Sequence, residues 1–143
     1  MIRVFILLLL TVLLAPSSFG FFWNKKEKPS LFLSPNDPRA EIAYELPLVN
    51  HAVFKKLDRI YFLVYVPEGF KSDYIKYQIV KQDDKAHVGG YTRIRNKTCR
   101  VSDKNYYIDY FVIQEAGKYI IQIFDIENLH QWITFGHFRV VDE

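Results

Sequence analysis

The feature that most constrains the fold is a series of short runs with the residue pattern of β-strands. Seven such runs follow residue 39, and the clearest are "DRIYFLVYVP", "DYIKYQIVKQ", "NYYIDYFVI" and "GKYIIQIFD". The others are "AEIAYEL", "VGGYTRIRN" and "HQWITFGHFRVVD". The segments between them are polar or contain Gly and Pro, as turns require. Many short strands joined by turns predict an all-β protein, built as a sandwich of two packed sheets.

One domain of this kind accounts for most of the chain. The protein has 143 residues, half of them hydrophobic and 17% aromatic, which suits a single core rich in strand-forming side chains. Ahead of the runs lie the charged cluster "NKKEK" and the turn signal "SPNDPR". We therefore expect a linker or N-terminal arm over 21–39 and the sandwich over 40–143. The segment "VNHAVFKKLD" is ambiguous, because its apolar residues would also share one face of a short helix.

The N-terminus has the pattern of a secretory signal peptide. It contains Arg3, an apolar or weakly polar run over 4–15 and then small residues up to a cleavage site ahead of Phe21. This predicts a signal helix over 1–20 and an exported protein, either secreted or periplasmic. The alternative is an uncleaved anchor, since the uncharged stretch 4–23 approaches the ~20 residues that span a bilayer. Membrane contact would then be made through this segment alone.

The cysteine content indicates which kind of exported protein this is. Cys99 is the only cysteine, so no intramolecular disulfide forms and the core alone must hold the fold together. This fits a bacterial periplasmic or surface domain better than an animal extracellular one. Two interpretations of Cys99 remain open, a reactive or intermolecular thiol and a small residue packed in a strand, and we favour packing.

The stretch "EAGKYIIQIFD" suggests which kind of sandwich forms. In a strand its side chains alternate, so that Tyr119, Ile121 and Ile123 face inward. A glycine two residues before a tyrosine at the start of such a strand, here Gly117 and Tyr119, resembles the tyrosine corner of immunoglobulin-like sandwiches. In that corner the phenol hydroxyl bonds to the backbone just upstream.

The resemblance to immunoglobulin-like and fibronectin-III-like domains covers residues 40 to 143. It implies an antiparallel β-sandwich of about seven strands in an exported protein of the bacterial envelope, without identifying a specific family. Ile121 stands where immunoglobulin domains have their second disulfide cysteine, and disulfide-free variants carry an aliphatic residue there. The partner position would be Phe62 or Leu63 in the central run "DRIYFLVYV".

The sequence carries no recognisable catalytic or metal-binding motif. The four histidines are not at close ligand spacing, and His130 and His137 would lie on opposite faces of an unbroken strand. Only a bulge, for example at Gly136, would bring that pair to one side. His51 and His87 stand apart from both. We therefore predict no catalytic residue, no cofactor, no metal site and no enzymatic activity.

Two surface features remain as candidate sites. A basic stripe of Arg93, Arg95, Lys97 and Arg100 would either deter edge pairing, which we favour, or contact anionic lipid headgroups or acidic glycans. The triplet Asn96–Thr98 is a glycosylation sequon, with meaning only in a eukaryotic secretory pathway. The second feature is a set of aromatic and aliphatic side chains that would either form a partner surface or cover the core: Tyr106, Tyr107, Tyr110, Ile120 and Phe124.

These features rank three functional classes. A formal net charge of only +3 gives no reason to expect a nucleic-acid partner. The leading prediction is a non-enzymatic exported binding or assembly module, which uses a sandwich face or edge to hold a protein of the cell envelope or exterior. The alternatives are a membrane-tethered structural accessory domain with an uncleaved N-terminal anchor, and a small enzyme or metal-binding protein without a recognisable motif.

Overall fold

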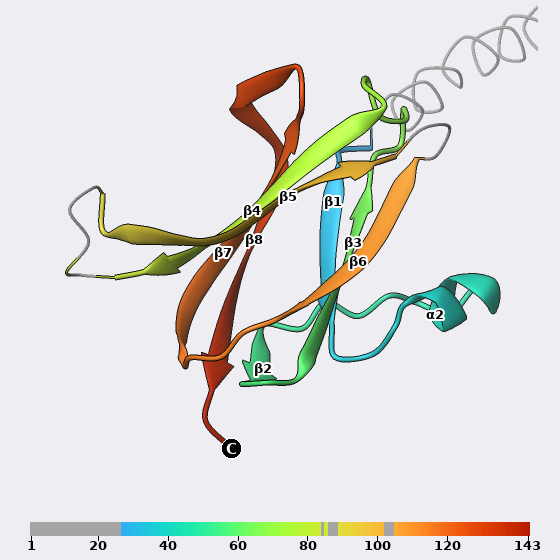
Figure 1. Cartoon of the computed structure of the whole chain (residues 1–143). Coiled ribbons are helices and arrows are strands. Elements are labelled where there is room, and N and C mark those ends of the chain that lie inside the picture. Colours follow the sequence, from blue (N-terminus) through green and yellow to red (C-terminus); the bar gives the residue numbers. More distant parts are fainter. Residues whose placement is uncertain (1–26, 84, 86–88, 102–104) are drawn as a thin grey trace, which may run out of the picture.

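The computed structural model describes residues 27–83, 85, 89–101 and 105–143 (Figure 1). The signal segment and cleavage site predicted above lie outside these residues. Within them the chain forms one short helix, α2, over Arg39–Ala43 and eight strands. The strands are β1 (Ser30–Ser34), β2 (Val53–Lys55), β3 (Arg59–Tyr65), β4 (Tyr74–Gln82), β5 (Tyr91–Arg100), β6 (Tyr106–Val112), β7 (Gly117–Asp125) and β8 (Asn128–Val141).

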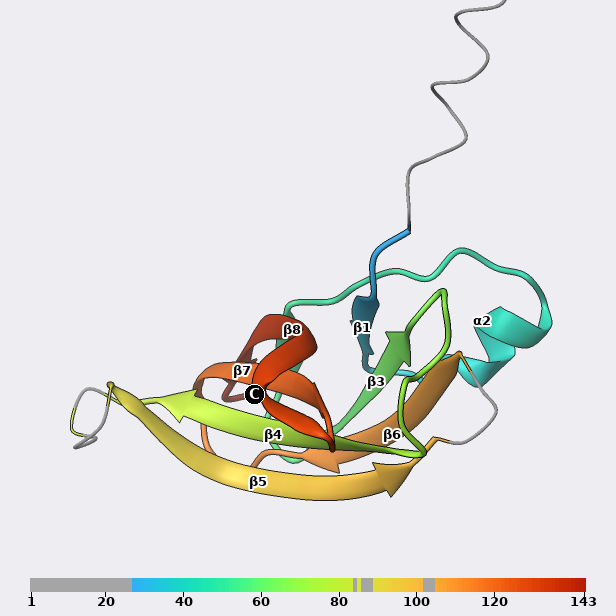
Figure 2. The same ribbon diagram turned by 90° about the horizontal axis from the view of Figure 1, so that it is seen from above.

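The strands form two sheets, which confirms the prediction of an all-β, sandwich-like domain. One sheet has the order β1-β3-β6 and the other the order β2-β8-β7-β4-β5. Strand pairs are antiparallel, except that β2 runs parallel to β8. Figure 2 shows β1, β3 and β6 on one side of the molecule, with β4 and β5 facing them from the other sheet.

The core lies between the sheets and is made by alternate residues of each strand. From β3, Ile60, Phe62 and Val64 are fully buried, and the inward row predicted for "EAGKYIIQIFD" is likewise buried on β7. Aromatic rings join the two layers, with the Phe62 and Tyr77 ring centroids 4.9 Å apart and those of Phe111 and Phe138 5.5 Å apart. Since the chain forms no intramolecular disulfide, this apolar packing is the main source of stability.

Two local expectations differ from the structure, which also resolves one segment that the sequence left open. Strand β1 lies inside the range 21–39, which we expected to be a linker, and it pairs in full with β3. The run "AEIAYEL", predicted as a strand, instead contains α2, because Ala and Glu favour helix and Pro38 has the φ of −73° that suits a helix start. The ambiguous "VNHAVFKKLD" contains β2 rather than a helix, and its backbone extends the edge of the sheet beside β8.

No helix in the described ranges, with their gaps, has both the length and the apolar character needed to cross a membrane.

Candidate functional site

The outer face of the three-stranded sheet carries apolar and aromatic side chains. Residues paired across antiparallel strands project to the same side, and Leu63 of β3 is paired with Phe32 of β1 and Ile108 of β6. The neighbouring pair is Tyr65 and Tyr106. These side chains alternate with the buried core row of β3, so they point away from the five-stranded sheet.

The residues between β1 and β2, 35–52, lie over this face, and we call them the covering segment. Leu63 points away from the core and is nevertheless only 3% exposed, so it must be covered from outside. Helix α2 stands beside β3 and β6, on the side away from the five-stranded sheet (Figure 2). The residues that follow it return to the edge of β1, where Asn50 Oδ1 accepts a 2.8 Å hydrogen bond from the Leu33 N–H and the His51 N–H donates to the Leu33 carbonyl at 2.8 Å.

Between the sheet face and the covering segment lies a pocket of about 590 Å³. The sheet contributes aromatic and aliphatic walls, the covering segment adds Ile42 and Leu48, and the chain just before β1 adds polar groups. The full lining is Glu27, Lys28, Ser30, Phe32, Ile42, Leu48, Leu63, Tyr65 and Tyr106. We call this the outer-face pocket. Its volume falls within the roughly 300–1,000 Å³ of small-molecule sites, and its apolar walls with a few polar groups match their usual chemistry.

Beyond the pocket, the same sheet face continues as an aromatic surface. The rings of Tyr61 and Tyr110 lie 5.5 Å apart, and the guanidinium of Arg59 stands 4.7 Å from the Tyr110 ring centroid. A hydrogen bond with Tyr61 raises the pKa of Arg59, with a further contribution from Tyr110. These contacts hold the side chains in place at the end of the sheet opposite the pair Tyr65–Tyr106.

The structure does not bring the predicted partner surface together. Tyr106, Tyr107 and Tyr110 lie on β6 of the three-stranded sheet, whereas Ile120 and Phe124 lie on β7 of the five-stranded sheet. The reason is the connection between β6 and β7, which crosses from one layer to the other. Of these residues, Tyr106 lines the outer-face pocket, and Tyr107 points inward instead.

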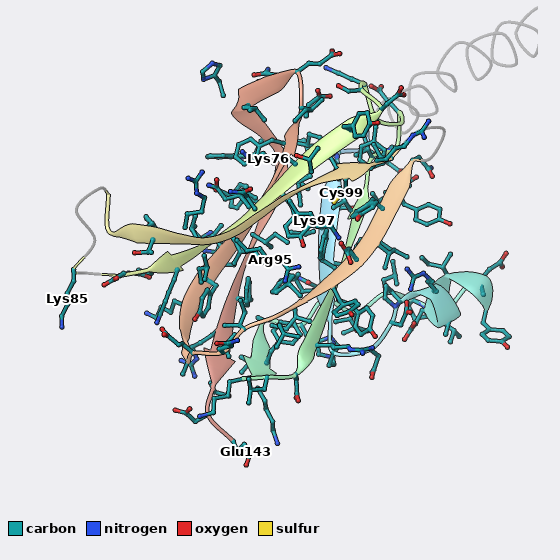
Figure 3. All side chains as sticks on the ribbon, in the orientation of Figure 1. Lys76, Lys85, Arg95, Lys97, Cys99 and Glu143 are labelled. Atoms are coloured by element: carbon teal, nitrogen blue, oxygen red, sulfur yellow. The ribbon has the colours of Figure 1, made fainter. Side chains whose placement is uncertain are left out.

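The predicted basic stripe is divided by an irregularity in β5. Arg95 and Lys97 pair with the buried residues Ile79 and Tyr77 of β4, so they lie on the side of β5 that faces β6 (Figure 3). The register of the two strands shifts between Ile79 and Val80 of β4. Because of this shift Arg93 pairs with Val80, and its side chain lies on the opposite face of the sheet from Arg95. Arg100 pairs with Tyr74 and also faces away from β6.

Cys99 belongs to a polar network between β5 and β6. Its thiol shares a hydrogen bond with the Tyr107 hydroxyl, which donates to Asp109 Oδ2 at 3.1 Å, and Lys97 Nζ donates to the same oxygen at 2.8 Å. Burial raises the pKa of Cys99, so the thiol stays protonated and is a poor nucleophile. Burial opposes the charge of Asp109, but hydrogen bonds from Lys97, the Tyr110 backbone and Tyr107 outweigh it and lower the pKa of Asp109.

Tyr77 is buried near this network but is not hydrogen-bonded to it. Its side chain is fully buried, and its hydroxyl has no hydrogen-bond partner in the part of the chain that the structure describes. Burial raises the pKa of Tyr77, and the charges of Arg95, Asp109 and Lys97 also act on it. The network therefore forms a packed junction between the sheets.

Gly117 and Tyr119 have the geometry of a tyrosine corner. The Tyr119 side chain is 2% exposed, and its hydroxyl donates to the Glu115 carbonyl at 2.6 Å. Its ring stacks on Phe138 with centroids 5.4 Å apart. A Cβ at Gly117 would lie 2.9 Å from Cε of Lys81 and 3.4 Å from the Tyr119 ring, so a glycine allows both side chains to pass close to the backbone.

The histidines do not converge where the structure places them. His51, His130 and His137 are exposed, whereas His87 is outside the described residues. Across the described ranges, no three His, Cys, Asp or Glu side chains are grouped so that they could hold a metal ion. Sequence reasoning missed the outer-face pocket, because its walls come from β1 and from the covering segment, whose positions depend on long-range pairing.

No protein-family model matches the sequence, and no curated protein matches it. Among solved structures, the chain is similar to a superoxide reductase (neelaredoxin) from Ignicoccus hospitalis. The TM-score is 0.40 at 8% identity, and the match covers 80% of each chain. A likeness this weak carries no argument about the chemistry of this protein.

Our leading functional prediction also needs correction. We predicted a non-enzymatic module that binds or assembles with a protein partner. The solved structure reported above is that of an enzyme, so it gives this prediction no support. The structure also does not bring together the five residues that we offered as one possible partner surface. We therefore withdraw that prediction.

Proposed function

We propose that this protein is an exported β-sandwich domain that takes up a small amphipathic molecule in the outer-face pocket. The observation that carries the proposal is a cavity of about 590 Å³ with largely apolar walls, on a sheet face that points away from the core. The outward face of an antiparallel sheet is commonly polar and solvated. Here the covering segment shields an apolar face and leaves a hollow beside it.

The lining indicates the chemistry of the bound molecule. Phe32, Leu63 and Leu48 offer an apolar interior, in which burying a hydrocarbon group is favourable by about 25 cal/mol per Å². Lys28 and Glu27 border the same pocket and supply one ammonium and one carboxylate. A molecule with a hydrocarbon body and a polar or charged end, such as a long-chain fatty acid, matches this distribution.

Export is part of the proposal and is supported by the signal-peptide pattern of residues 1–20. An exported protein meets free lipids and other amphipathic molecules outside the cytoplasm, which gives the pocket a suitable ligand class. Fusing residues 1–20 to a reporter should move the reporter out of the cytoplasm. A reporter that stays inside would contradict this part of the proposal.

We also propose that the sandwich is immunoglobulin-like. The order β1-β3-β6 corresponds to strands A, B and E of that fold, and β8-β7-β4 corresponds to G, F and C. The tyrosine corner of the fold stands at the start of strand F, and Tyr119 stands near the start of β7. Strand order and corner geometry thus support the same assignment.

The binding proposal is tested by filling the pocket. Ile42 lines it and is 37% exposed, so Ile42→Trp adds volume inside the pocket without disturbing the buried core. We expect wild-type protein to bind a fluorescent long-chain fatty acid saturably, and Ile42→Trp to weaken binding by about tenfold or more.

The matched control is Val112→Trp, on the outward face of β6 but outside the pocket lining, at a position that is 39% exposed. This variant should bind as the wild type does, and thermal melts should show that both variants remain folded. Absence of saturable binding to the wild type, or equal binding by both variants, would contradict the proposal.

A further inference from the structure

A second cleft lies at the end of the sandwich where the β3–β4 connection meets the β7–β8 hairpin. Both turns lie at the upper end of the molecule in Figure 1. The cleft has a volume of about 620 Å³ and is lined by Pro29, Val66, Glu68, Gly69, Phe70, Lys71, Asp125, Glu127, Asn128, Gln131, Trp132 and Ile133. Unlike the outer-face pocket, it combines apolar and polar walls. We call it the hairpin cleft.

Trp132 provides a flat aromatic surface in the hairpin cleft. Its side chain is 47% exposed, so the indole is accessible to a ligand in the cleft. The Phe135 ring packs edge-on against the indole, with centroids 5.2 Å apart and planes at 69°. This contact fixes the orientation of the indole, so little entropy is lost when a ligand stacks on it.

The two sides of the cleft are tied together by a hydrogen bond. The Ser72 hydroxyl donates to Asp125 Oδ1, linking residues 53 positions apart, and the same carboxylate oxygen accepts the Glu127 N–H at 2.9 Å. Asn128 Oδ1 accepts the His130 N–H at 3.3 Å and so stabilises the turn. These hydrogen bonds stabilise the β7–β8 hairpin and hold it against the β3–β4 connection, so the shape of the cleft is present before a ligand binds.

The polar side chains on the cleft walls offer both donors and acceptors. Within the described part of the chain, no hydrogen bond or ion pair engages the side chains of Lys71, Glu127 and Gln131. Lys71 donates, the carboxylate of Glu127 accepts, and the amide of Gln131 does both. A purely apolar ligand would cover these polar groups without offering them hydrogen bonds, and their lost hydration would weaken binding.

We propose that the hairpin cleft binds a saccharide, one ring of which stacks on Trp132. A sugar ring has an apolar C–H face that suits an indole and hydroxyls that both donate and accept, which matches Lys71, Glu127 and Gln131. A small cation fits less well, because the ammonium of Lys71 lines the same cleft. This site is independent of the fatty-acid proposal, since its lining shares no residue with the outer-face pocket.

The test uses chitotriose and maltotriose as probes of the purified protein. The chain has two tryptophans, so Trp23→Phe leaves Trp132 as its single indole. Stacking of a sugar on that indole should change its fluorescence saturably with at least one of the two trisaccharides. Calorimetric titration should then show binding weakened about tenfold or more in Trp132→Ala, and less strongly in Trp132→Phe and Gln131→Ala.

Tyr91→Ala serves as the matched control, because Tyr91 is an aromatic residue with 44% exposure on β5, outside this cleft. It should leave sugar binding unchanged. Failure of both trisaccharides to bind at millimolar concentration, or equal affinity in Trp132→Ala and wild type, would overturn the proposal. Trp132→Phe keeps an aromatic ring, so it keeps the test decisive if Trp132→Ala does not fold.

Discussion

At the scale of single residues, Tyr119 combines packing and hydrogen bonding at the edge of the core. Its ring stacks on Phe138, and its hydroxyl closes the turn that begins at Glu115. The local pattern Gly-x-Tyr was sufficient to predict this geometry, because the hydrogen-bonded groups lie within four residues of each other. Tyr107 shows the opposite case. Alternation already places Tyr106 and Tyr107 on opposite faces of β6, so they could not share one surface; that Tyr107 is the one facing inward follows from its pairing with Val64.

Substitutions at Tyr119 should separate the two contributions to the free energy of unfolding. Tyr119→Phe leaves the Glu115 carbonyl without its donor and should cost about 1–3 kcal/mol. Tyr119→Ala also opens a cavity and should cost about 3–5 kcal/mol. Tyr91→Ala, at an exposed position, should cost little. Urea unfolding measures all three, and equal small losses would mean that residue 119 does not pack in the core.

At the scale of elements, the strands that the sequence predicted well are those with long alternating or fully apolar runs. In β3, β4 and β7 the buried positions are the apolar positions of the sequence pattern, so local sequence and tertiary structure agree. β1 has only five residues, between charged and turn-forming segments, and its strand character comes from pairing with β3. The register shift in β5 depends on β4 in the same way, which is why the basic stripe looked continuous in sequence.

The contribution of β1 to the domain can be measured directly. Leu33 is 1% exposed and belongs to the core, so Leu33→Ala should lower the free energy of unfolding by about 2–5 kcal/mol. Leu46→Ala, in the covering segment at a position that is 55% exposed, is the matched control and should have little effect. If urea melts of the two variants coincide, residues 21–39 are a linker as the sequence first indicated, and β1 is not part of the fold.

At the scale of the whole molecule, the two sheets enclose the core, and both the outer-face pocket and the hairpin cleft lie on its surface. The outer-face pocket depends on the covering segment, which is anchored to β1 through Asn50 and His51. The hairpin cleft depends on the turns at one end of the sandwich. Such sites are assembled from residues distant in sequence, so composition and motifs predicted the sandwich but neither hollow.

The central claim is that an amphipathic molecule enters the outer-face pocket, and methyl NMR tests it most directly. Leu48, Leu63 and Ile42 line the pocket, whereas Leu129 and Ile94 are exposed methyl-bearing residues outside it. On titration with a long-chain fatty acid, we predict saturable shifts of the three pocket residues and unchanged signals from the other two. Unchanged pocket signals, or shifts confined to Leu129 and Ile94, would contradict the account.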